Sequence, residues 1–250
     1  MKRIWIISLF PEFFRPLFET GVVGSAMRGE RGLMPELTFL NPSDYNEKGF
    51  KGVDAAPYGG GAGQVMRADV LEMTLMKGVI EKGHYGELLD EALESLHICY
   101  LGPRGETFHS ELAKKMCEQY LQQEKGKDLV FICGRYEGID ERFIEKYVNQ
   151  HLSLGDFVLS GGELALLPIL DAILRFYPGV LGNSASAEEE SFSNGLLEYP
   201  QYTRPQIACD REVPSILSSG HHEKVKKWRN EQSIKMTKRY RPDLLRVDKK

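Results

Sequence analysis

Three glycine-rich turns, each following a strongly apolar run, constrain the fold of this chain more than any other feature. The runs cover residues 96–101, 129–133 and 151–154. Short apolar runs of this kind are typical of buried strands, and turns that follow parallel strands gather at one edge of the sheet, where open α/β folds bind their ligands. Glycine also lets the backbone approach a ligand closely. Three such turns within about 65 residues therefore predict one shared ligand site.

The turns have the sequences YLGPRG (100–105), GRYEG (134–138) and GDFVLSGGE (155–163). The chain has no GxxxxGK[ST] motif, and residues 59–63 do not begin a GxGxxG motif because Gln64 follows them. The GxSxG and HExxH motifs are also absent from the sequence. A glycine-lined site with Tyr136, Glu137 and Asp156 suits a nucleoside, since backbone groups can contact an adenine edge and a carboxylate can accept from ribose hydroxyls.

Alternating strand-like and helix-like segments predict an α/β domain with a mostly parallel sheet. Residues 4–10 and 37–40 are further strand candidates, each followed closely by proline. The spacing of apolar residues predicts helices over 12–27, 68–81, 106–122, 139–148 and 162–177. Residues 52–66 are too rich in glycine for either element, and we expect a mobile loop there.

The character of the sequence changes after Gly182. Residues 183–197 are small, polar or acidic and predict a flexible linker, in which Ser186 and Glu189 have the spacing of a capping box. Residues 198–250 are rich in lysine, arginine and aromatic residues, with a helix expected over 221–235. We therefore predict a domain over 1–182, the linker, and a small helical domain over 198–250.

The net charge of −4 combines two regions of opposite charge. Residues 1–180 carry 19 basic and 26 acidic residues, a balance of −7, whereas residues 198–250 carry 13 basic and seven acidic residues, a balance of +6; the three glutamates of residues 181–197 supply the remaining −3. A basic segment with aromatic residues suits RNA, whose phosphates attract lysine and arginine and whose unstacked bases pack on aromatic rings. A solvated helix face has the same composition, so charge alone leaves both interpretations open.

Composition excludes other classes of protein. No apolar stretch is long enough to span a membrane, and the apolar part of the N-terminus is too short for a signal peptide. The four cysteines form neither a CxxC pair nor a cluster with histidine. This usage favours a reduced, cytoplasmic protein and predicts no metal site.

Several longer motifs follow one another along nearly the whole chain. They are SLFPE (8–12), DAAPYGGG (54–61), CGRYEGIDER (133–142), GDFVLSGGE (155–163), RFYPGVLG (175–182) and YTRP (202–205). In these motifs the sequence closely resembles the bacterial tRNA (guanine-N1)-methyltransferases, which methylate the guanosine at position 37, next to the anticodon. The resemblance implies an α/β fold of the SPOUT class, with a deep trefoil knot, and S-adenosylmethionine as the methyl donor.

The resemblance also implies a homodimer in which one subunit holds the cofactor and the other supplies the catalytic residues, with tRNA carrying guanosine 37 as the partner. Matched by position, the residues expected to bind the cofactor are Tyr100, Leu101, Gly102, Arg104, Tyr136, Glu137, Gly138, Leu154, Gly155, Phe157, Leu159, Gly161 and Gly162. Two of these depart from the family pattern, because Gly102 stands in place of the usual serine and Arg104 in place of the usual glutamine.

Two residues are expected to act on the guanine. Arg175 matches the family's catalytic arginine and would stabilise negative charge on O6. The family's general base is an aspartate directly before Ser-Phe, and here Glu190 holds that position, with Glu189 as the weaker alternative. Without the resemblance, residues 188–190 would be a solvated acidic patch and Arg175 a helix-terminal residue favoured by the helix dipole.

Two alternative functions stay open. A SPOUT methyltransferase for another RNA nucleotide would share these motifs. A non-catalytic RNA-binding protein could keep the nucleoside pocket, and the replacement of the family aspartate by Glu190 keeps that alternative in view. The resemblance further brings a magnesium requirement, which no metal-ligand spacing in the sequence supports.

Overall fold

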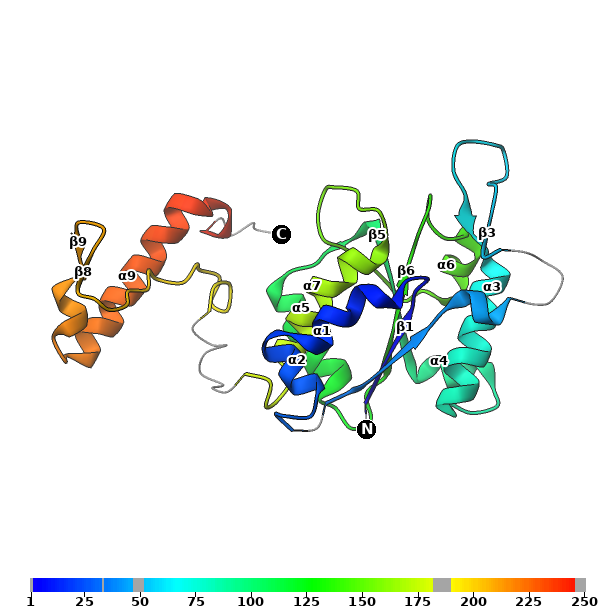
Figure 1. The fold of residues 1–250 in the computed structure, drawn as a ribbon, viewed down its shortest axis with the longest axis horizontal. Helices are drawn as coiled ribbons and strands as arrows, with labels where there is room; N and C mark the ends of the chain where they lie inside the picture. Colours follow the sequence, from blue (N-terminus) through cyan, green and yellow to red (C-terminus); the bar gives the residue numbers. More distant parts are fainter. Residues whose placement is uncertain (1, 33, 47–51, 182–189, 246–250) are drawn as a thin grey trace. The chain divides into compact units, whose positions relative to one another are not determined.

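The computed structural model describes residues 2–32, 34–46, 52–181 and 190–245. The chain divides into two compact units, Met1–Gly182 and Asn183–Lys250, and each is described by itself (Figure 1). The predicted capping box of Ser186 and Glu189 lies outside the described residues.

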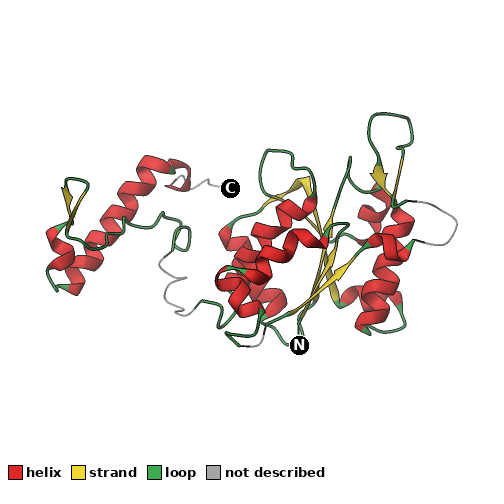
Figure 2. Cartoon of the chain, viewed as in Figure 1, coloured by secondary structure: helices red, strands yellow, loops and turns green. Residues whose placement is uncertain are grey.

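The first unit is built on a five-stranded sheet with the order β2-β1-β6-β5-β7 (Figure 2). Every pair of neighbouring strands in this sheet is parallel. The strands are β1 (Arg3–Ile7), β2 (Glu36–Leu40), β5 (Leu96–Thr107), β6 (Asp128–Cys133) and β7 (Gln150–Ser153). The prediction of an α/β unit with a mostly parallel sheet is confirmed, and each apolar run identified in the sequence lies on a strand.

Helices cover both faces of this sheet, as Figure 1 shows. One face carries α1 (Arg15–Glu19), α2 (Gly21–Met27), α5 (Ser110–Met116) and α7 (Gly162–Arg175). The other carries α3 (Ala68–Met73), its π-helical continuation η3 (Thr74–Glu81), α4 (Leu89–Glu94) and α6 (Glu141–Tyr147).

Two separate hydrophobic cores result from this arrangement. Along β1, Ile4 and Ile6 belong to the core under α7, whereas Trp5 and Ile7 belong to the core under α3. Successive strand residues point to opposite faces, so a strand buried on both faces has a continuous apolar run instead of an alternating one. This is the physical reason why the runs were recognisable in the sequence.

The first of the three glycine-rich turns differs from the prediction. Strand β5 continues through residues 102–105 to Thr107, and both Leu101 and Glu106 pair with Leu152 of β7. Residues 102–105 therefore form a bulge inside the strand, which resumes its pairing afterwards. The helix expected from residue 106 accordingly begins later, at Ser110, where the ring of His109 accepts a hydrogen bond from the backbone of Leu112.

The glycine-rich segment over 52–66 also contains regular structure. A short antiparallel ladder joins β3 (Asp54–Ala55) to β4 (Val65–Met66) and closes the glycine-rich residues into a hairpin. Met66 forms a further bridge with Ile139, beyond β6. A uniformly irregular loop was therefore the wrong expectation, because its two ends pair with each other.

The second unit is small and largely polar. It contains the ladder of β8 (Ile207–Ala208) and β9 (Arg211–Glu212), the 3-10 turns η5 (Ser215–Ser218) and η6 (Pro242–Leu245), and helix α9 (His222–Tyr240). The helix expected over 221–235 corresponds to α9, which extends to Tyr240. The β8–β9 ladder was not predicted; Cys209 and Asp210, both with positive φ, form its turn.

Candidate active site

The three glycine-rich segments meet in one pocket of about 260 Å³. It lies where β5, β6 and β7 lead into their following segments, as parallel topology requires. Eleven of the thirteen residues expected to bind the cofactor line it: Tyr100, Leu101, Gly102, Tyr136, Glu137, Gly138, Leu154, Phe157, Leu159, Gly161 and Gly162. The sequence therefore predicted which segments come together.

Tyr100 of β5 forms one wall of this pocket, and the glycines around it have a packing role. A Cβ at Gly134 would lie 2.8 Å from the Tyr100 ring, and one at Gly102 would lie 3.0 Å from it. Burial raises the pKa of the Tyr100 hydroxyl, which therefore stays protonated at neutral pH. These two glycines make room for a buried tyrosine ring, a requirement that the sequence pattern did not show.

The loop after β6 is held by the glycine-rich hairpin. The backbone N–H of Glu137 donates to the carbonyl of Gln64 at 3.0 Å, and that of Met66 donates to the carbonyl of Gly138 at 2.9 Å. Gly63 lies so close to Glu137 that a Cβ there would lie 2.4 Å from its carboxylate. These contacts attach the β3–β4 hairpin to the loop after β6 that lines the pocket.

A buried ion pair supports the loop after β7. Arg135 Nε lies 2.8 Å from Glu163 Oε2, and the Ser8 hydroxyl donates to Glu163 Oε1 at 2.8 Å. Arg135 Nη1 donates to the carbonyl of Ser160 at 3.1 Å, and the guanidinium lies 4.5 Å from the ring centroid of Phe10. This cluster connects the ends of β1 and β6 with the start of α7, next to the pocket that Arg135 helps to line.

Sequence reasoning did not identify this cluster as part of the site. Ser8, Arg135 and Glu163 do belong to three of the motifs that carry the family resemblance, which was the available signal. Glu163 is fully buried in the first turn of α7, where the helix dipole also favours a negative charge. Burial beside this carboxylate raises the pKa of the Cys133 thiol, which stays protonated.

The rim of the pocket is apolar and open. Phe157 is 54% exposed and Val158 is 85% exposed, with Leu159 and Tyr136 also exposed next to them. Burial raises the pKa of the Tyr136 hydroxyl, and so does the Asp54 carboxylate, through its negative charge and by accepting a hydrogen bond from the hydroxyl. A contiguous exposed apolar rim around a pocket is typical of a surface that is covered by a ligand or another protein.

Arg104 and Gly155 are the two expected cofactor residues that do not line the pocket. The Arg104 guanidinium instead forms a bidentate ion pair with Glu141, with Nη2–Oε2 at 2.7 Å and Nη1–Oε1 at 3.2 Å. This pair lowers the pKa of the Glu141 carboxyl. The side chain of Arg104 thus connects the β5 bulge to the start of α6.

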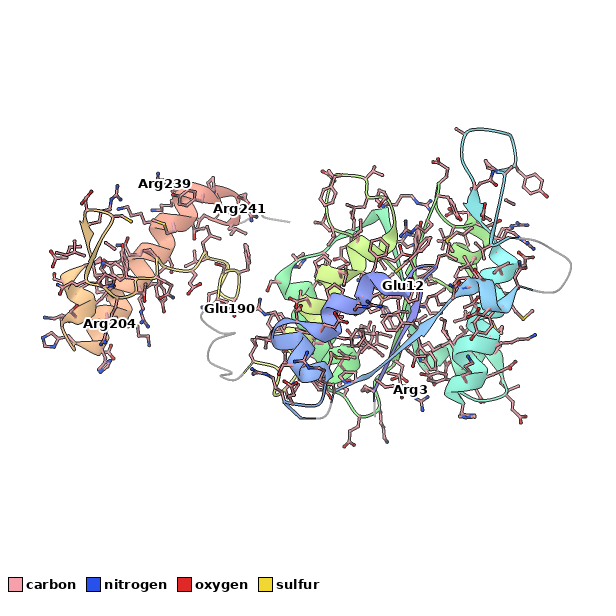
Figure 3. The ribbon with its side chains drawn as sticks, viewed as in Figure 1. Arg3, Glu12, Glu190, Arg204, Arg239 and Arg241 are labelled. Carbon is pink, nitrogen blue, oxygen red and sulfur yellow. The ribbon has the colours of Figure 1, made fainter. Side chains whose placement is uncertain are left out.

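The two expected catalytic residues come from α7 and from the second unit. Arg175 is the last residue of α7, whose first residue, Gly162, lines the pocket. Ala165 of the same helix also lines the pocket, and Arg175 lies ten residues further along, about 15 Å at 1.5 Å per residue. Glu190 belongs to the second unit (Figure 3), where its carbonyl accepts from the Ser193 hydroxyl at 2.7 Å. Glu189 lies outside the described residues.

The described residues show neither a cluster of metal ligands nor a membrane-spanning helix. Among the described residues, no group of three or more histidine, cysteine, aspartate or glutamate side chains could hold a metal ion. No helix within the described part of the chain is both long and apolar enough to cross a membrane.

Comparison with known proteins assigns these features to one family. A family model described as tRNA (Guanine-1)-methyltransferase TrmD matches residues 1–247. A tRNA (guanine-N(1)-)-methyltransferase of Clostridium beijerinckii is 46% identical over 243 residues, which cover 97% of this chain and 91% of the relative. The proteins of the same name from Clostridium botulinum (strain Loch Maree / Type A3) and Clostridium tetani are each 44% identical over 244 residues, covering 98% of this chain and 92% of the relative.

Proposed function

The chain belongs to the tRNA (guanine-1)-methyltransferase family, and from this premise we propose that it transfers a methyl group from S-adenosylmethionine to N1 of guanosine 37 in tRNA. The observation that supports this most directly is the meeting of the three glycine-rich segments in one pocket. Their residues match the positions at which the family holds its methyl donor.

The pocket residues fit S-adenosylmethionine. Leu154 and Leu159 supply apolar contacts for an adenine ring, the surrounding peptide groups can contact its polar edge, and the Glu137 carboxylate can accept from ribose hydroxyls. When bound, the cofactor supplies an electrophilic methyl group on a sulfonium. The chain's own contribution here is to orient the donor and to shield one side of it from water.

Glu190 is our proposed general base. Neutral guanine carries a proton on N1, so this nitrogen is a poor nucleophile until the proton is removed. A carboxylate at N1–H accepts that proton as the N1–methyl bond forms, an effect worth about 10²–10⁴-fold in rate. The glutamate replaces the family aspartate and carries one more methylene, which its segment must accommodate.

Arg175 is our proposed electrostatic partner of the guanine. As N1 loses its proton, negative charge develops on O6, and a fixed guanidinium beside O6 stabilises that charge. Removal of a donor of this kind typically costs about 10²–10³-fold in kcat.

The distance of about 15 Å along α7 from Ala165 to Arg175 supports an active site shared between two copies of the chain. Because most of α7 separates Arg175 from the residues of that helix that line the pocket, we propose that Arg175 and Glu190 act on the pocket of a second subunit. The exposed apolar rim at Phe157 and Val158 supports this arrangement, since a second subunit would cover it.

The remaining family properties are proposals of the same kind. We propose that the pocket segments form the trefoil knot, that residues 183–197 act as the linker, and that the basic residues 198–250 hold tRNA in the cytoplasm. Magnesium is assigned no protein ligands, because the described residues contain no cluster that could bind it.

Methyl transfer to tRNA transcripts tests the proposed function. We expect labelled methyl from S-adenosylmethionine to enter a transcript with guanosine 37 but not one with adenosine 37. Equal labelling of both would instead indicate an enzyme for another nucleotide. Cofactor binding without any labelling would indicate a non-catalytic RNA-binding protein.

A further inference from the structure

One face of α9 carries a row of lysines. Residues Lys224, Lys227, Glu231, Lys235 and Lys238 follow one another at spacings of three and four, which places them on the same face of a helix with 3.6 residues per turn. All five are exposed. We call these five residues the lysine stripe.

The packing of α9 directs this stripe to the solvent. Ser233 and Thr237 are buried on the opposite side of the helix, and Val225 is half-buried there. The Thr237 hydroxyl accepts from the backbone N–H of Leu197 at 2.8 Å and donates to the carbonyl of Ser233 at 2.7 Å. These contacts set the rotation of the helix within its unit, so the lysines lie on the outer face.

The stripe is a linear positive surface. The four lysines and one glutamate of the stripe have a net charge of +3, and the stripe extends about 21 Å along the helix. Arg239, next to the last of these residues, adds a further positive charge at the end of α9 (Figure 3). A row of positive charges on a rigid rod complements the regular row of phosphates along a nucleic-acid strand.

We propose that the lysine stripe of α9 binds the phosphate backbone of the tRNA. The proposal rests on the proposed function, which supplies tRNA as the substrate, and it names the surface that holds it. Lysine binds phosphate as a point charge, and phosphate contacts position a protein on RNA without reading bases. The stripe therefore supplies affinity that is the same for every tRNA, and the pocket supplies the choice of nucleotide.

Glu231 gives the proposal a specific consequence. Its carboxylate lies in the middle of the stripe and would face the phosphates, so it opposes binding. Replacing it with lysine should raise the affinity for tRNA, an effect that damage to the fold cannot produce. Lys226 offers the matched control, because it is an exposed lysine on the same helix outside the stripe.

The test measures the Kd of the full-length protein for a tRNA transcript over a range of salt concentrations. For Lys227→Gln we expect binding about three- to sixfold weaker at 0.1 M salt, and a slope of log K against log salt smaller by about 0.7–0.9. Glu231→Lys should shift both quantities in the opposite direction. The four lysines replaced together should lose most of the salt dependence, and Lys226→Gln should change binding least.

Three outcomes would overturn the proposal: unchanged tRNA binding by the fourfold variant, weaker binding by Glu231→Lys, or an equal loss with Lys226→Gln. Unchanged tRNA binding by the fourfold variant would indicate that the lysine stripe binds an acidic protein surface instead of tRNA. Methyl transfer at saturating tRNA separates the two proposals. If the wild-type protein methylates guanosine 37 while the stripe variants bind tRNA normally, the proposed function stands. Only the proposed role of the lysine stripe is then wrong.

Discussion

Arg135 Nε lies 2.8 Å from Glu163 Oε2, and the glutamate side chain is completely buried while that of the arginine is 15% exposed. The pair joins the loop after β6 to the first turn of α7, next to the proposed cofactor pocket that Arg135 helps to line. Separating the two side chains would leave a buried charge without its counter-ion, which is strongly destabilising. The ion pair therefore fixes the position of the loop after β6 relative to α7.

Replacing Glu163 with glutamine keeps the shape of the side chain but leaves the Arg135 charge without a partner. We expect the free energy of unfolding to fall by about 3–5 kcal/mol and the Kd for S-adenosylmethionine to rise. Chemical denaturation and calorimetric titration measure these two quantities. Ser8→Ala is the milder control, because it leaves the ion pair in place and removes two hydrogen bonds, one to Glu163 and one from the backbone of Phe10, each worth about 1 kcal/mol. If Glu163→Gln is no more harmful than Ser8→Ala, the ion pair does not have this role.

Glu190→Gln tests the proposed general base. The amide keeps the shape of the side chain but cannot accept the N1 proton, so we expect kcat to fall by about 10²–10⁴-fold. The Kd for S-adenosylmethionine should stay unchanged, because Glu190 is not one of the residues expected to bind the cofactor. Glu190→Asp, which restores the residue typical of the family, should retain activity. A fully active Glu190→Gln would assign the base to another group, with Glu189 the next candidate.

The proposed sharing of the active site between two subunits makes a prediction that a variant homodimer alone cannot test. Leu159→Arg should block the cofactor pocket, Arg175→Ala should remove the residue acting on O6, and each homodimer should be inactive. A heterodimer isolated through two affinity tags should regain one complete site out of two, about half of the wild-type activity. An inactive heterodimer that still binds one cofactor would indicate that each chain uses its own Arg175.

Acid should remove the contribution of Glu72 to the stability of the first unit. The hydroxyl of Tyr147 and the ammonium of Lys146, which lies 2.9 Å away, lower the pKa of this carboxyl below its usual 4.5. A carboxyl with a lowered native pKa stabilises the fold above its unfolded pKa and loses that effect as the pH falls through the native value. The contacts connect α3 with α6.

We therefore expect Glu72→Gln to lower the free energy of unfolding by about 1 kcal/mol at pH 7 and to have progressively less effect as the pH falls below 4.5. Denaturant unfolding followed by Trp5 fluorescence measures this, in a Trp228→Phe background that removes the signal of the second unit. Glu81→Gln, an exposed carboxylate at the end of η3, is the control. If Glu72→Gln lowers the free energy of unfolding by the same amount at every pH, the side chain of Glu72 stabilises the fold through packing and not through its charge.

Local patterns predicted most elements of the first unit. Strand β6 and helix α7 were both recognisable, because burial of a strand on two faces or of one helix stripe leaves a periodic apolar signal. The bulge at 102–105 was not recognisable, since glycine and proline suit a turn and a bulge equally well and the difference lies in the pairing of Glu106 with Leu152. The pairing of Asp54 with Met66 was not predicted either, because it also depends on which segments pair and not on a local pattern.

The sequence by itself determined the parallel α/β unit and the residues that would meet at one end of its sheet, because apolar periodicity and glycine positions are local properties. Only the tertiary structure decided how that end is supported. Ser8 and Glu163 are 155 positions apart, yet their side chains meet because β1, β6 and α7 pack together. It also decided that Arg175 lies about 15 Å along α7 from Ala165, the last residue of that helix that lines the pocket. Such contacts depend on how distant segments fill a shared volume, and no local pattern records that packing.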